Sequence, residues 1–107
     1  MDKNAVLKII HRFKKAVESR DVTIKQIILF GSFKDGTFRE DSDIDLVVIS
    51  DDFDGMDYWQ RIDILSEAIY EVFEPIEAVA ITPDEWNRRE SLVVDYARNG
   101  EVVYVAA

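Results

Sequence analysis

Residues 31–46 read GSFKDGTFREDSDIDL, and the end of this stretch decides how the chain is interpreted. Asp43 and Asp45 are separated by one residue at the start of the β-rich apolar run Ile44–Ile49. Because side chains alternate along a strand, both carboxylates are expected to leave the same face of the sheet. Carboxylates this close repel each other unless a cation lies between them, and their hard oxygen atoms suit Mg²⁺. The pattern predicts a divalent metal site, the alternative being a solvated strand edge.

Gly31 and Ser32 directly follow residues 24–30, an apolar run that predicts a buried strand. A glycine at this point lets backbone N–H groups approach a phosphate closely, and the hydroxyl of Ser32 adds a donor. Glycine and serine also dominate ordinary turns, which is the competing interpretation. The spacing between Gly31 and Asp43 favours phosphate binding.

Glu77 supplies a third carboxylate from another predicted strand, Ile76–Ile81, where it stands between apolar neighbours. From an adjacent strand it would reach the same metal, and three acids suit a two-metal site for phosphoryl transfer. The alternative is that Glu77 lies on the exposed face of an edge strand. The sequence alone leaves both interpretations open.

Helical and β patterns alternate along the rest of the chain. Apolar spacing predicts amphipathic helices over residues 5–17 and 59–73. A capping box that begins at Thr82 predicts a last helix that ends before Gly100, and residues 102–105 predict a final strand. This order indicates an α/β or α+β fold in one domain that spans residues 1–107.

Two further features are interpreted as structural. Trp59 and Phe73 occupy helical core positions, so with Trp86 they are expected to close the core or to cover a partner surface. The acidic residues 51–57 lack the spacing of a calcium loop, and a solvated loop is expected there.

Composition and charge exclude several classes of function. The 107 residues contain no cysteine, which excludes disulfides and thiolate metal sites. The formal net charge of −9 disfavours a long nucleic-acid substrate, whereas a small triphosphate with its metal can still bind. No run of apolar residues approaches the roughly 20 residues of a membrane span. The N-terminus has the periodicity of an amphipathic helix and not the plan of a signal peptide. We therefore expect no membrane association and a cytoplasmic location.

The run GSFKDGTFREDSDIDL, with Glu77 downstream, resembles the signature of the polymerase-β-like nucleotidyltransferases, and the chain length resembles that of their minimal members. The resemblance covers nearly the whole chain and implies a single small mixed β-sheet flanked by helices. It also implies a nucleoside triphosphate substrate, with ATP as the donor and one or two Mg²⁺ ions. In this family the first two acids hold Mg²⁺ on the triphosphate, and the third helps to activate an acceptor hydroxyl that displaces pyrophosphate. The residues that it assigns to nucleotide binding are Gly31, Ser32 and Ser42, and those assigned to the metal and to catalysis are Asp43, Asp45 and Glu77.

The resemblance also implies a partner. Minimal members are often paired with a small all-helical (HEPN-type) protein and act as its antitoxin, some by adenylylating it; the oligomeric state stays open. Two departures from the family pattern matter: Asp35 stands where a basic residue is common, and Glu77 is one methylene longer than the usual aspartate. Lys34 and Arg39 are candidates to compensate. The alternative function is therefore a weakly active or inactive antitoxin that neutralises a helical partner by contact.

Overall fold

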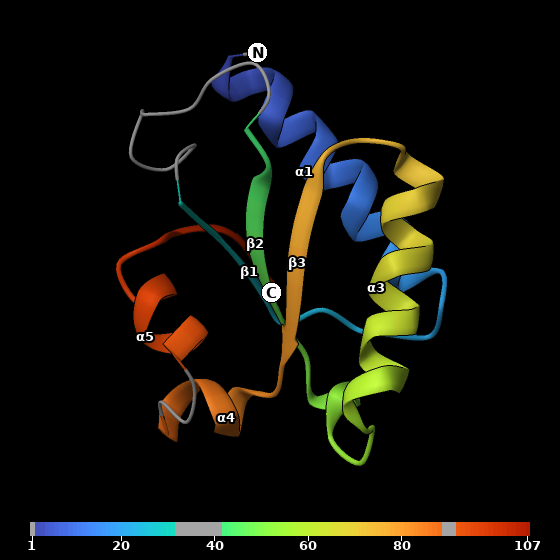
Figure 1. Cartoon of the computed structure of the whole chain (residues 1–107), viewed down its shortest axis with the longest axis vertical. Helices are drawn as coiled ribbons and strands as arrows, with labels where there is room; N and C mark the ends of the chain where they lie inside the picture. The colour runs from blue at the N-terminus through green and yellow to red at the C-terminus, as the bar shows by residue number, and fades with distance from the viewer. Residues whose placement is uncertain (1, 32–41, 89–91) are drawn as a thin grey trace.

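The computed structural model describes residues 2–31, 42–88 and 92–107. Four strands form one sheet in the order β3-β2-β1-β4 (Figure 1). β1 runs antiparallel to β2 and to β4, whereas β2 and β3 are parallel. The expected mixed sheet is therefore confirmed. The bounds of the strands are β1 Gln26–Phe30, β2 Ile44–Ile49, β3 Ile76–Ile81 and β4 Glu101–Val105.

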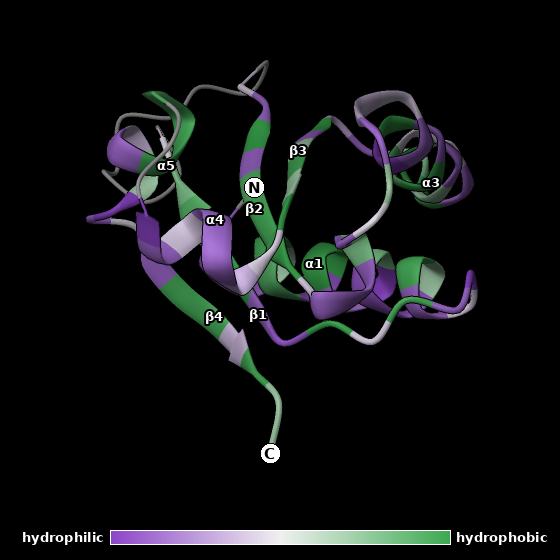
Figure 2. Ribbon diagram, turned by 90° about the horizontal axis from the view of Figure 1, so that it is seen from below, coloured by the Kyte–Doolittle hydropathy of each residue, from purple (hydrophilic) through white to green (hydrophobic). Residues whose placement is uncertain are grey.

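Helices cover both faces of this sheet (Figures 1 and 2). On one face lie α1 Lys3–Glu18 and α3 Tyr58–Val72. On the other lie two short helices, α4 Pro83–Arg88 and α5 Leu92–Ala97. A 3-10 turn, η1 Asp51–Phe53, connects β2 to α3. No helix in the described part of the chain is long and apolar enough to cross a membrane.

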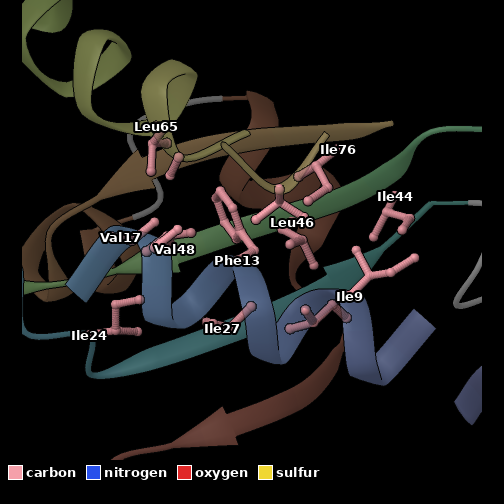
Figure 3. Close-up of a cluster of buried hydrophobic side chains, with 14 of the residues drawn as sticks. Ile9, Phe13, Val17, Ile24, Ile27, Ile44, Leu46, Val48, Leu65 and Ile76 are labelled. Atoms are coloured by element: carbon pink, nitrogen blue, oxygen red, sulfur yellow. The ribbon is translucent and has the colours of Figure 1, made fainter. Parts of the chain in front are cut away.

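The main core lies between the sheet and the pair α1 and α3 (Figure 3). Phe13 of α1 and Leu65 of α3 meet Leu46 of β2 there, since every second residue of a strand faces the same layer. The intervening residues Val47 and Ile49 face the opposite layer, where α4 and α5 pack. Because both faces of β2 are covered, this strand reads as a continuous apolar run that only Asp45 interrupts.

Two acidic side chains of the loop after β2 accept hydrogen bonds from backbone N–H groups. The side chain of Asp57 accepts a hydrogen bond from Gln60 N at 2.8 Å and caps α3. Asp52 accepts one from Thr23 N at 2.7 Å and ties the acidic loop to the start of β1. The loop expected to be merely solvated therefore contains two carboxylates with structural roles.

The boundaries of several expected elements hold. Of the two alternatives expected for Trp59 and Phe73, closing the core is wrong: they are 70% and 84% exposed, because Leu65, Ala68 and Val72 define the buried side of α3 and these two aromatic residues lie outside it. Covering a partner surface stays a prediction. The single last helix is also wrong: α4 and α5 are separate helices. Trp86 of α4 and Val94 of α5 pack on the same face of the sheet.

Candidate functional site

The site lies where β1 ends and β2 begins. Phe30, the last residue of β1, is the cross-strand partner of Asp45, so Gly31 lies directly beside the Asp45 side chain. Gly31 has a φ of +74°, in the left-handed region that favours glycine. A Cβ atom at Gly31 would overlap Oδ2 of Asp45 and lie 3.1 Å from its Cγ. Only glycine allows the backbone to approach this carboxylate so closely.

Glu77 meets Asp45 from the other side. The two residues are partners in the parallel β2-β3 ladder, and their carboxyl groups share a hydrogen bond. The pKa of Asp45 is raised from its usual 3.8 to about 6, most strongly by burial and then, in decreasing order, by the hydrogen bond with Glu77, the charge of Glu77 and the charge of Asp43. Asp45 is therefore harder to ionise than an ordinary aspartate, and a cation bound beside it would favour its charged form.

Asp43 contributes to the site through its charge. It lies one residue before β2 and is exposed, so strand alternation alone does not fix its direction. In the described part of the chain, no group of three or more histidine, aspartate or glutamate side chains is gathered closely enough to hold a metal ion. Asp45 and Glu77 thus meet, whereas Asp43 stands near them without completing a ligand cluster.

An open pocket surrounds these carboxylates. Asp45 and Glu77 line it together with apolar side chains from both layers, because β3 is an edge strand of the sheet and the pocket extends over both of its faces. From α3 come Ile62, Leu65 and Ile69, and from α5 come Leu92, Val93 and Tyr96. The pocket therefore joins a polar centre to apolar walls, which is the usual plan of a small-molecule site.

The structure brings several of the expected site residues together, and others lie outside the described residues. Gly31, Asp45 and Glu77 come together, Asp43 lies next to them, and Ser42 is partly buried just before Asp43. Ser32, Lys34, Asp35 and Arg39 lie outside the described residues.

Sequence reasoning missed the walls of the pocket, which include Phe30, Leu92 and Tyr96. Leu92 and Tyr96 do stand four residues apart, but the sequence does not distinguish a helix face that packs on the sheet from one that lines a pocket.

The geometry suits chemistry on a phosphorylated ligand. Hard carboxylate oxygens bind Mg²⁺, the backbone at Gly31 can approach a phosphate, and a carboxyl group that exchanges a proton near neutral pH can act in acid–base steps. The arrangement has no cysteine and, within residues 2–31, 42–88 and 92–107, no histidine near Asp45; His11, the sole histidine of the chain, is exposed on α1.

Comparisons with known proteins bear on the family and the fold of the chain. The family model described as "Nucleotidyltransferase domain" matches residues 10–97. A relative from Methanocaldococcus jannaschii, named "Putative protein adenylyltransferase", is 29% identical over 88 residues, covering 82% of this chain and 81% of its own length.

Solved structures share the fold. A nucleotidyltransferase-like protein from Sulfolobus solfataricus has a TM-score of 0.70 with 18% identity, covering 92% of this chain and 79% of that one. A toxin–antitoxin protein crystallised with AMP-PNP has a TM-score of 0.58 with 22% identity, covering 99% and 75%. The fold is thus similar to that of minimal nucleotidyltransferase antitoxins.

Proposed function

The chain belongs to the nucleotidyltransferase domain family, and we propose that it transfers a nucleoside monophosphate, AMP from ATP, to a hydroxyl group of a protein or small molecule. Its mixed sheet with flanking helices has the polymerase-β-like nucleotidyltransferase fold. One observation carries the proposal: the carboxyl groups of Asp45 and Glu77 meet beside the bare backbone of Gly31, on the wall of a pocket.

The donor set fits Mg²⁺. The carboxyl groups of Asp45 and Glu77 meet, the charge of Asp43 is close enough to raise the pKa of Asp45, and all the donors are hard oxygens. A bound Mg²⁺ ion would reduce the negative charge that the triphosphate presents to an attacking oxygen. We assign the metal and triphosphate to Asp43 and Asp45, with Glu77 as the third acid.

The chain's own groups then have distinct roles in the transfer. The backbone at Gly31, with Ser32 and Ser42, binds the phosphates. The carboxylate of Glu77 accepts the proton of the acceptor hydroxyl while that oxygen bonds to the α-phosphorus and the bond from this phosphorus to the pyrophosphate oxygen breaks. Pyrophosphate leaves, and the proton passes from Glu77 to solvent. Positioning of the two reactants contributes most in reactions of this kind.

We propose that the acceptor is a small helical protein and that this chain is its antitoxin. The similarity to a protein adenylyltransferase and the fold shared with a toxin–antitoxin protein support a protein acceptor. The net charge of −9 favours a basic partner over a nucleic acid.

The test is adenylyl transfer to the helical protein encoded by the neighbouring gene. The chain is incubated with that protein, ATP and Mg²⁺, and intact-mass spectrometry looks for addition of one or more adenylyl groups. Transfer is expected with the parent and with Asp63→Asn, which alters an exposed acid on α3 away from the pocket, and it is expected to fail with Asp45→Asn and Glu77→Gln. Equal transfer by all four proteins would contradict the assigned site.

A second candidate function is an antitoxin that neutralises its partner by contact alone. The specific observation in its favour is the set of exposed aromatic side chains at or beside α3, which the core does not use. These are Tyr58, Trp59, Tyr70 and Phe73. If Asp45→Asn neutralises the partner as fully as the parent does, while Trp59→Ser does not, contact suffices and transfer is dispensable.

A further inference from the structure

An exposed apolar face on α5 borders the reactive end of the pocket. Leu92 and Tyr96 are 87% and 70% exposed, and they stand one helical turn apart, so they share a face. Val94 and Ala97 of the same helix are buried against the sheet. The helix is therefore anchored on one side, while its other side presents an aliphatic and an aromatic side chain to the pocket.

One side chain, the ring of Phe30, lies between Tyr96 and the carboxylates. The Tyr96 ring packs edge to face on Phe30, with centroids 5.7 Å apart and planes at 80°. Phe30 is the cross-strand partner of Asp45, and partners of this kind have Cβ atoms about 5 Å apart. Tyr96, Phe30 and Asp45 therefore follow one another along the wall of the same pocket.

We propose that Tyr96 and Leu92, backed by Phe30, form the surface on which the nucleoside base of the bound triphosphate lies. The inference rests on the proposed function and adds a position and a set of residues to it. It makes Tyr96 a positioning residue for the donor nucleotide.

The geometry of in-line transfer favours this placement. The attacking oxygen and the leaving pyrophosphate lie on opposite sides of the α-phosphorus. Glu77 on β3 and Gly31 after β1 lie on opposite sides of Asp45. The line from the attacking oxygen through the α-phosphorus to the leaving pyrophosphate therefore crosses the sheet from strand to strand. The nucleoside must project sideways from that line, and α5 covers the same face of the sheet as Asp45 and Glu77.

Charge identifies which end of the nucleotide faces α5. Asp95 is exposed and lines the pocket beside Tyr96, and its negative charge disfavours a phosphate there. An uncharged aromatic base is compatible with that charge and gains stacking and apolar contacts from Tyr96 and Leu92.

The experiment compares two probes by isothermal titration calorimetry of the full chain: ATP with Mg²⁺, and inorganic tripolyphosphate with Mg²⁺. Tyr96→Ala is expected to weaken ATP binding between about 5-fold and 150-fold, the range of base–aromatic stacking, and to leave tripolyphosphate binding within twofold. Tyr96→Phe should bind ATP as the parent does. Tyr70→Ala, which removes a similarly exposed tyrosine from α3, is the matched control and should change neither affinity.

A second variant keeps the test decisive if Tyr96→Ala does not fold. Leu92→Ser alters a more exposed position and should also weaken ATP binding without changing tripolyphosphate binding, and the melting temperature of each variant is recorded.

The remaining outcomes separate the inference from the function on which it rests. Unchanged ATP affinity in Tyr96→Ala and Leu92→Ser overturns the inference and leaves the proposed function standing, and loss of partner binding alone in these variants would mean that the face binds protein. Equal weakening of both probes also overturns it, because Tyr96 would then support the whole site. If the parent binds neither probe, the proposed function and the inference both fail.

Discussion

The Asp45 carboxylate lies against the backbone of Gly31, in space that a Cβ atom would occupy. The contact joins the end of β1 to the second residue of β2, and Gly31 adopts a φ of +74° to make it. Two requirements therefore meet at one residue: a left-handed backbone and the absence of a side chain. They can be separated by experiment, since Gly55 has a φ of +83° with nothing within 4 Å of a Cβ atom built there.

We expect Gly31→Ala and Gly55→Ala to lose similar stability but to differ in function. Each places a Cβ in the left-handed region, at a cost of about 1–2 kcal/mol in the free energy of unfolding. Only Gly31→Ala also displaces the Asp45 carboxylate, so only this variant should lose binding of ATP with Mg²⁺. Urea unfolding measures the first effect and calorimetry the second. Normal nucleotide binding by Gly31→Ala would refute the role given to this contact.

The raised pKa of Asp45 predicts a pH-dependent stability in the absence of metal. The pKa is about 6 in the folded chain and 3.8 in its usual state, so between these values the folded state binds more protons than the unfolded state. The contribution of Asp45 to stability is therefore full below about pH 4 and is lost as the pH rises through 6.

Asp45→Asn removes this titration. The stability of the variant relative to the parent should increase from pH 4 to pH 6 and level off above it, as measured by urea unfolding in the presence of a chelator. Asp63→Asn serves as the control and should show no such trend. A constant difference between Asp45→Asn and the parent at every pH would mean that Asp45 has an ordinary pKa.

Binding of ATP with Mg²⁺ should raise the melting temperature of the parent. At a ligand concentration one hundred times the dissociation constant, linkage adds about 2.7 kcal/mol to the free energy of unfolding. In a domain of this size that shift amounts to many degrees.

Asp43→Asn and Asp45→Asn should be at least as stable as the parent without ligand, because each removes a repelling charge, but they should not respond to the ligand. An equal shift in all three proteins would show that these carboxylates do not hold the metal. Absence of a shift in the parent would favour the contact antitoxin.

The capping box at the start of α4 should contribute to the free energy of unfolding and not to nucleotide binding. Thr82 Oγ1 accepts a hydrogen bond from Glu85 N at 3.1 Å, and Glu85 Oε1 accepts one from Thr82 N at 2.9 Å. Thr82→Ala should therefore cost about 1 kcal/mol in the free energy of unfolding. Nucleotide affinity should stay at the parental value. A large loss of ATP binding would mean that α4 contributes to positioning the pocket walls.

The sequence alone was sufficient for much of the fold and for the centre of the site. Apolar periodicity predicted α1, β2, β3 and α3 to within a few residues, because local spacing decides which side of an element can be buried. Asp45 stood out because an ordinary core strand does not carry an acid without a reason, whereas the sequence left Glu77 open between a site residue and an exposed residue of an edge strand. The capping box at Thr82 was also predictable, since its hydrogen bonds join residues three apart.

Tertiary structure decided what depends on neighbours distant in the sequence. Only the ladder between β2 and β3 shows that Asp45 and Glu77 are partners, and only the approach of β1 to β2 shows why residue 31 must be glycine. The exposure of Trp59 and Phe73 likewise follows from which side of α3 meets the sheet, which an apolar stripe on its own does not specify. Local periodicity determines which faces can be buried, but the packing of the layers determines which faces are.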